Sequence, residues 1–400
     1  MMRLLKCSTA LAFALGFAGA SQAEELQAWR YFVSDHAQPS ITVVDAVSKQ
    51  TLDTLTVNGP AALHRTSSGE SVFAIQGAAG VVNVVSTGIS VHDHGDHGDL
   101  KVEDASLLDV SFAGAKPSHF VEHGGAIALF FDGEGISRNV MEDAVLQGDA
   151  TFVEYKTKAP HHGVSVAYGD HVLLSEPNEE KPDELPVGIR VVDRAGDMVG
   201  DVHACPDLHG EASSGNLLAF ACATGLLLVT HGDNGPQVRH LPYAEALPAG
   251  KSTTLIGGRG LQYFLGNYGP DRIVLIDPAE AEAFRLIELP VRRVHFAVDP
   301  VRSKFAYIFT EDGQLHQLDV LSGTLVQSLK LTDPYSMDGH WSDPRPRIAV
   351  SGTEIAVTDP LKGLIHLVNA EIFEPAGSIS LDGKPFNIVA VGGSGEKHDH

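Results

Sequence analysis

The sequence predicts an all-β protein, a single β-propeller of eight four-stranded blades. Short runs of alternating apolar and polar residues follow one another through residues 24–391, separated by Gly, Asp, Pro and Asn, and helical periodicity is nearly absent. The clearest unit, 292–332, contains four such runs with turn residues between them. Its length of about forty residues is the size of one propeller blade.

One strand pattern recurs along the chain and gives the number of blades. The third run of a unit has an aspartate between apolar residues, as in Ile41–Val47, Ile189–Arg194 and Ile273–Pro278, and a fourth run follows each time. The fourth strands of the eight units are predicted to end near Val57, Phe112, Lys156, Ala204, Leu241, Leu289, Leu331 and Leu381. Seven blades is the alternative count, because the unit that contains 251–289 is irregular.

The last apolar run, Phe386–Val391, has no partner strands of its own. We expect it to be the innermost strand of the first blade, whose other three strands lie at the N-terminus. This arrangement closes the ring and removes the free sheet edges that would otherwise promote aggregation. The polar, Gly-rich tail 392–400 that follows is predicted to be flexible.

The N-terminus has the pattern of a secretory signal peptide, residues 1–23. Arg3 and Lys6 precede the apolar run Ala10–Ala20, and Ser21-Gln22-Ala23 is an acceptable cleavage site. Its removal takes away two basic residues and no acidic one, which changes the formal charge from −23 to −25. An acidic, exported chain without another long apolar run is expected in the periplasm, as a monomer that binds neither nucleic acid nor membrane.

Two cysteines, Cys205 and Cys222, remain after the signal peptide with Cys7 is removed. An isolated pair in an oxidising compartment usually forms a disulfide, so a bond between these two cysteines is predicted. The alternative is a metal site made of thiolates, which a disulfide would abolish.

The stretch Val91–Leu100 is unusually dense in potential metal ligands. It contains three histidines and three aspartates, namely His92, His94, His97, Asp93, Asp96 and Asp99. Two glycines and the lack of apolar residues between the histidines favour a mobile loop over a helix or a buried strand. Imidazole and carboxylate groups are ligands of Zn²⁺, so the stretch is predicted to bind a metal ion. The alternative is a solvated polar loop without a ligand.

A second group of histidines follows from the blade pattern. Six of the eight units have a histidine near the start of the innermost strand, which lines the central channel of a propeller: His64, His119, His162, His209, His295 and His340. Zn²⁺ needs three or four such ligands. Neighbouring blades offer the shortest reach, which favours the first four histidines over the last two, with Glu122, Asp207 and Glu211 as candidate carboxylates. The alternative is that these histidines satisfy buried backbone groups.

With these features the chain resembles the AztD family of periplasmic zinc metallochaperones, β-propellers that pass zinc to the solute-binding protein of a zinc ABC importer. The resemblance rests on the signal peptide, on the His-x-His-x-Asp-His stretch (His92, His94, Asp96, His97), and on the motif Cys205–Ala212 with the paired Cys222. It implies one high-affinity site in the folded body and a second, flexible site in the His/Asp-rich loop.

Zinc carriage and handover to such a solute-binding protein is therefore the predicted function, with no enzymatic activity. The alternatives are a metal-dependent propeller enzyme of the hydrolase or lactonase type, or a propeller binding scaffold. The sequence has no G-x-S-x-G nucleophile elbow and no cofactor fingerprint. Imidazole ligands suit Cu²⁺ and Ni²⁺ as well as Zn²⁺, so the residue types alone do not select the metal.

Overall fold

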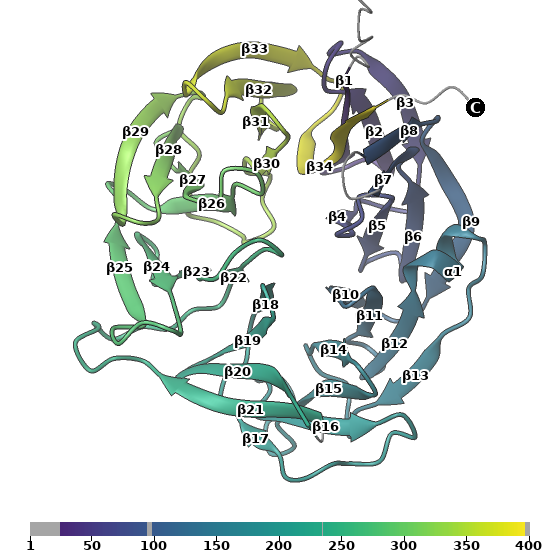
Figure 1. The fold of residues 1–400 in the computed structure, drawn as a ribbon, viewed down its shortest axis with the longest axis vertical. Helices are drawn as coiled ribbons and strands as arrows, with labels where there is room; N and C mark the ends of the chain where they lie inside the picture. Colours follow the sequence, from purple (N-terminus) through teal and green to yellow (C-terminus); the bar gives the residue numbers. More distant parts are fainter. Residues whose placement is uncertain (1–24, 94–97, 234, 397–400) are drawn as a thin grey trace, which may run out of the picture.

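The computed structural model describes residues 25–93, 98–233 and 235–396, and these form eight sheets arranged in a ring (Figure 1). The prediction of eight blades is confirmed, and the alternative of seven is wrong. The predicted signal peptide, residues 1–23, lies outside the described residues. No helix in the described part of the chain is long and apolar enough to cross a membrane.

Each of the first four blades has its strands in order from the channel outward. The first consists of β34 (Pro385–Glu396), β1 (Glu25–Asp35), β2 (Ser40–Asp45) and β3 (Thr51–Thr56), and the second of β4 (Ala62–Arg65), β5 (Ser71–Gln76), β6 (Val81–Ser86) and β9 (Ser106–Ala113). The third consists of β10 (Pro117–His123), β11 (Ala126–Phe131), β12 (Ile136–Met141) and β13 (Val153–Lys156), with the short helix α1 (Glu142–Leu146) before its last strand. The fourth consists of β14 (Ser165–Tyr168), β15 (His171–Glu176), β16 (Gly188–Asp193) and β17 (His203–Ala204).

The other four blades have the same order. The fifth consists of β18 (Glu211–Ser214), β19 (Leu217–Cys222), β20 (Gly225–Gly232) and β21 (Gly235–Pro242), and the sixth of β22 (Leu255–Ile256), β23 (Phe264–Asn267), β24 (Arg272–Ile276) and β25 (Phe284–Glu288). The seventh consists of β26 (Arg293–Val298), β27 (Phe305–Thr310), β28 (Gln314–Asp319) and β29 (Thr324–Lys330), and the eighth of β30 (Ile348–Val350), β31 (Glu354–Asp359), β32 (Leu364–Asn369) and β33 (Glu374–Ser380).

Apolar side chains fill the spaces between neighbouring blades. The second strand of a blade is buried on both faces, as in β5 and β11, because a sheet lies against each side of it. The outermost strands are largely exposed, as in β3 and β33. One core cluster, for example, joins Val121 of the third blade, Val166 of the fourth and Phe220 of the fifth. These cores fix the innermost strands rigidly around the channel.

The ring closes as predicted, but the closing strand is longer than expected. β34 pairs with β1 from Pro385 to Glu396, so the prediction of a flexible tail is wrong for residues 392–396. The glycines that suggested flexibility allow close pairing instead. A Cβ at Gly392 would meet the carbonyl oxygen of Ala28 at 2.1 Å, so only glycine fits at that position. Residues 397–400 lie outside the described residues.

The His/Asp-rich stretch lies in an insertion of the second blade. Its ends form a hairpin of β7 (Ile89–Asp93) and β8 (Gly98–Val102), and β8 joins the end of β34. The prediction of a loop over the whole of 91–100 is therefore wrong at both ends. The reason is that Ile89 and Leu100 are buried apolar anchors on either side of the polar residues. His92 is placed in β7, whereas His94, Asp96 and His97 lie outside the described residues.

Candidate metal centre

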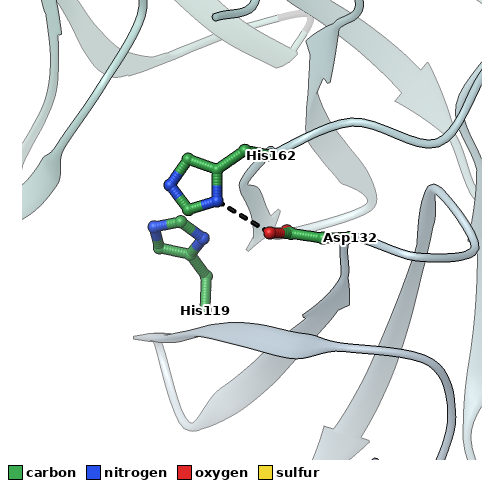
Figure 2. Close-up of side chains that lie close together, drawn as sticks. All are labelled: His119, Asp132 and His162. Atoms are coloured by element: carbon green, nitrogen blue, oxygen red, sulfur yellow. Dashed lines mark hydrogen bonds and ion pairs between the residues drawn. The ribbon is translucent and has the colours of Figure 1, made fainter. Parts of the chain in front are cut away.

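Three of the four favoured channel histidines lie together. His119 is on β10, and His162 and His209 lie in the segments that lead into β14 and β18, so three consecutive blades contribute one imidazole each. The ring centroids of His119 and His162 are 4.8 Å apart, and those of His162 and His209 are 5.2 Å apart. Figure 2 shows the first two rings pointing toward one another, with the carboxylate of Asp132 beside His162.

Local backbone structure brings Asp132 to these histidines. It is the first residue of the tight turn between β11 and β12, and its backbone N–H donates to the carbonyl oxygen of Lys116 at 2.9 Å. A β-bulge between Pro117 and His119 shifts the register of β10 against β11 at the same place. Bulges redirect the side chain that follows them. Asp132 therefore directly follows the strand that pairs with β10, and it lies near His119 at the end of the channel where the innermost strands begin.

The carboxylate of Asp132 is the centre of a hydrogen-bond network. Its Oδ2 accepts a hydrogen bond from Nδ1 of His162 at 2.7 Å, and its Oδ1 accepts from the hydroxyl of Ser118 and, at 3.4 Å, from the backbone N–H of Gly163. Burial alone would raise the pKa of Asp132, but the hydrogen bonds from His162 and Ser118 hold it below its usual value. The carboxylate is therefore ionised at neutral pH.

The hydrogen bonds assign the same tautomer to all three imidazoles. Nδ1 of His209 donates to the carbonyl oxygen of Thr253 at 2.7 Å, and Nδ1 of His162 donates to Asp132. The hydroxyl proton of Ser118 is used toward Asp132, so Nδ1 of His119, 3.2 Å from that hydroxyl, is the donor there. Each ring consequently has an unprotonated Nε2, which is the form of histidine that binds metals.

The donor atoms are close enough together to share one ion. One ligand atom from each of His119, Asp132 and His162 forms a group in which all three lie within 4.8 Å of one another. His209 lies next to His162 and adds a third imidazole. Three imidazole nitrogens form a donor set that suits Zn²⁺, and Asp132, which accepts the Nδ1 proton of His162, orients that ligand from behind. The residues present therefore fit a zinc ion.

The surroundings of His119 and His209 keep these two imidazoles neutral. Burial lowers the pKa of His119 to about 3, with smaller contributions from His162, His209 and His64 that the carboxylate of Asp132 opposes. Burial also lowers the pKa of His209. A neutral ring has no proton to lose when a metal binds, so binding at neutral pH does not compete with protonation of these two residues.

The other predicted histidines have different surroundings. His64 stacks on Phe120 with ring centroids 5.3 Å apart, and burial lowers its pKa to about 4. It does not belong to the ligand group found among the described residues. Nδ1 of His295 accepts a hydrogen bond from the backbone N–H of Ile348 at 3.1 Å, and His340 is exposed at the surface. His161, next to His162, uses both ring nitrogens in hydrogen bonds and is structural.

The three carboxylates proposed from the sequence lie outside this group. Glu122 accepts hydrogen bonds from Ser67, and Asp207 forms an ion pair with Lys251 at 2.9 Å. Partial burial raises the pKa of Glu211 to about 8. The carboxylate that sequence reasoning missed is Asp132, because Phe-Asp-Gly-Glu-Gly is typical of a turn. Its position directly after the second strand of a blade was the available signal.

The disulfide holds the segment before His209 in place. Cys205 and Cys222 are bonded as predicted, and both are buried, so the alternative of a thiolate metal site is wrong. The backbone N–H of His209 donates to the carbonyl oxygen of Ala221 at 3.1 Å, and Ala221 directly precedes Cys222. The second predicted metal site, in the stretch 91–100, stays a prediction.

These observations define a β-propeller with a candidate metal centre of imidazoles and a carboxylate on three consecutive blades of its channel. No family model matches the sequence. The zinc chaperone AztD of Citrobacter koseri is 53% identical over 403 residues, which cover 100% of this chain and 96% of that protein. The chain therefore belongs to the AztD family.

Two solved structures from the same organism agree with this assignment. A crystal structure of C. koseri AztD has a TM-score of 0.92 at 55% identity, covering 93% of this chain and 100% of that one. The structure of apo AztD has a TM-score of 0.90 at 53% identity, with the same coverage.

Proposed function

We propose that this protein is a zinc chaperone of the periplasm, which holds Zn²⁺ at Nε2 of His119, His162 and His209, with Asp132 orienting His162, and delivers it to the solute-binding protein of a zinc ABC importer. The observation that carries the proposal is the common tautomer of the three imidazoles, each with Nε2 free, in a chain 53% identical to a protein named as a zinc chaperone. That name describes a carrier, in agreement with the prediction that the chain is not an enzyme.

The geometry of the centre suits retention of zinc. Asp132, Ser118 and the carbonyl oxygen of Thr253 fix the three rings before any ion arrives. Little side-chain freedom is lost when the ion binds, and preorganisation of this kind raises affinity. Zn²⁺ has no redox chemistry, so the bound ion is carried unchanged.

The exposed side of the centre suits release. The side chain of His162 is 43% exposed, whereas Asp132 behind it is buried. A ligand from a partner protein can therefore replace His162 first while the other ligands still hold the ion. Stepwise exchange avoids a bare, desolvated ion, which would be prohibitive in energy.

The His/Asp-rich stretch enters the proposal as a second, intermediate ligand set of His92, His94, Asp96 and His97. Its place in the fold, away from the metal centre, means that a role in transfer has to be tested directly. The last residues of the innermost strands line one pocket, among them Arg65, Glu122 and Val350, and β34 continues beyond that end to join β8. The hairpin is thus attached at the end of the channel opposite to the start of β10, where the metal centre lies.

The test is zinc transfer from the loaded mature protein to an apo solute-binding protein of a zinc importer, followed by the fluorescence of the partner. His92, His94 and His97 are replaced together by Asn, and the matched control is His340→Asn. We expect the triple variant to stay loaded at the channel centre and to deliver zinc more slowly. Delivery at the rate of the unmodified protein would mean that zinc leaves directly from the mouth at His162.

A further inference from the structure

One side chain crosses the central channel at the end opposite to the metal centre. Arg259 lies between β22 and β23 of the sixth blade, and Ser67 lies in the turn that follows β4 of the second blade. Nη2 of Arg259 donates a hydrogen bond to Oγ of Ser67 at 2.9 Å. The second and sixth blades are four apart in a ring of eight, so they face each other (Figure 1). This hydrogen bond therefore spans the channel.

The connection continues from the second blade to the third. The backbone N–H of Ser67 donates to Oε2 of Glu122 at 2.6 Å, and its hydroxyl donates to Oε1 of the same carboxylate. The hydroxyl of Ser67 thus accepts from Arg259 and donates to Glu122, as a hydroxyl can do both at once. Three blades are joined by one chain of hydrogen bonds, which we call the Arg259 bridge (Arg259, Ser67 and Glu122).

The segment that carries Arg259 is fixed against the fifth blade. A Cβ at Gly257 would meet the carbonyl oxygen of Ser213 at 2.3 Å, so only glycine permits this close approach. The carbonyl oxygen of Gly258 accepts a hydrogen bond from the backbone N–H of Gly215 at 3.1 Å. The backbone on which Arg259 stands is therefore held in place, and the long side chain extends from it across the channel.

The bridged end of the channel has a net positive charge. A cavity of about 430 Å³ opens there, and its wall on the seventh, eighth and first blades is aliphatic. The charged side chains among its lining residues are Arg65, Arg259 and Glu122. Both oxygens of Glu122 accept hydrogen bonds from Ser67, and the two guanidinium groups exceed this carboxylate by one positive charge. A divalent cation is repelled by such a lining, as arginines in pores exclude cations.

We propose that the Arg259 bridge, together with Arg65, closes this end of the channel to cations, so that zinc enters and leaves the metal centre only at the mouth beside His162. The inference rests on the proposed zinc centre and specifies the route to it. The His/Asp-rich stretch is attached at the bridged end, where β8 joins β34. Zinc therefore passes between that stretch and the metal centre outside the channel, or by way of the partner protein.

The kinetics of zinc exchange test whether this end is closed. Stopped-flow mixing of the zinc-free mature protein with Zn²⁺ gives the association rate constant, and mixing of the loaded protein with excess chromogenic chelator gives the dissociation rate constant. Arg259→Ala opens a second mouth, so both rate constants should rise about twofold or more. Their ratio, the Kd, should stay the same, because lowering a barrier changes neither the free nor the bound state.

Three further variants separate the bridge from the charge. Arg239→Ala removes the same charge from the exposed strand β21 and should leave both rate constants unchanged. Ser67→Ala breaks the bridge without removing a charge, and Arg259→Lys keeps the charge, so each should accelerate exchange less than Arg259→Ala does. Unchanged rate constants in Arg259→Ala, or a changed Kd, would overturn the proposal.

A second measurement does not depend on zinc. Ala297 lines the cavity, and Cys205 and Cys222 are bonded to each other, so Ala297→Cys adds a reactive thiol to the mature protein. A methanethiosulfonate with a sulfonate group should modify this thiol several-fold faster than one with a trimethylammonium group, and Arg259→Gln should reduce the preference. Equal rates for the two reagents would overturn the closed end. The predicted preference in a protein that does not bind zinc would support the closed end and refute the proposed function.

Discussion

His119 and His295 occupy the same position in two blades that face each other across the channel, yet they have opposite chemistry. Each is the third residue of its innermost strand, and each follows the same β-bulge, at Pro117/His119 and at Arg293/His295. Nδ1 of His119 donates a hydrogen bond and leaves Nε2 free for a metal, whereas Nδ1 of His295 accepts one and leaves Nε2 protonated. The propeller brings histidines together, but their neighbours decide what they can bind.

The carboxylate that follows the second strand shows where the two blades diverge. Asp132 and Glu311 both donate a backbone N–H to the residue before the innermost strand, Lys116 and Arg292 respectively. The side chain of Arg292 forms an ion pair with Glu311, whereas Asp132 stays available to orient His162. One basic side chain thus decides whether the carboxylate is free to orient a histidine.

The largest expected effect comes from removing each histidine in turn. His119→Ala should weaken zinc binding on the order of 100-fold or more, because it removes a ligand and not only its support. His295→Ala should leave zinc affinity nearly unchanged, because its Nε2 carries a proton. Competition with a chromogenic chelator measures both, and circular dichroism checks the fold. Equal losses in the two variants would remove the distinction between the blades.

The second comparison concerns the disulfide, which supports the segment before His209 and has no counterpart near His295 among the described residues. Replacing both Cys205 and Cys222 by Ser should lower the free energy of unfolding by about 3 kcal/mol on the chain-entropy estimate. Denaturant unfolding measures this change. Thiol labelling of the denatured, non-reduced protein should find no free cysteine, and two free thiols would contradict the pairing.

A smaller effect on zinc affinity is expected from the two equivalent carboxylates, Asp132 and Glu311. Asp132→Asn should weaken zinc binding about 10- to 100-fold, as is usual when the partner of a metal-binding histidine is lost. Glu311→Gln removes the equivalent carboxylate from the seventh blade and is the matched control. Similar affinity in Asp132→Asn and the unmodified protein would show that Asp132 neither binds nor orients the ligands.

The dependence of stability on pH should be shared by the two blades, in contrast to metal binding. The folded pKa of His119, about 3, and that of His295 lie below the value of about 6.5 expected in the unfolded chain. As the pH falls below 6.5, the unfolded chain takes up protons that the folded protein does not, so the free energy of unfolding falls. His119→Gln and His295→Gln should each flatten this dependence in zinc-free protein. Denaturant unfolding at pH values above and below about 6.5 measures this dependence. If the free energy of unfolding changed with pH in both variants as it does in the unmodified chain, the account would be contradicted.

The fold could be read from the sequence because each blade repeats a strand pattern. The predicted end of the first blade at Val57 is one residue beyond β3, and the third, fourth and fifth blades supplied the three histidines expected from the alignment. The hydrogen-bond and packing partners of those histidines could not be predicted from the sequence. Stacking on Phe120 fixes His64 away from the ligand group, and this depends on packing between blades. The glycine-rich tail suggested flexibility, because the close fit of Gly392 against Ala28 and Trp29 of β1 appears only in three dimensions.

Zinc-soaked crystals measured at the zinc absorption edge test the central claim most directly. The account predicts one strong anomalous peak in the channel, about 2.0–2.1 Å from Nε2 of His119, His162 and His209. Nδ1 of His209 and of His162 should still donate to Thr253 and Asp132. A peak on His295 or His64, or no channel peak in a protein that binds zinc tightly, would contradict the assignment.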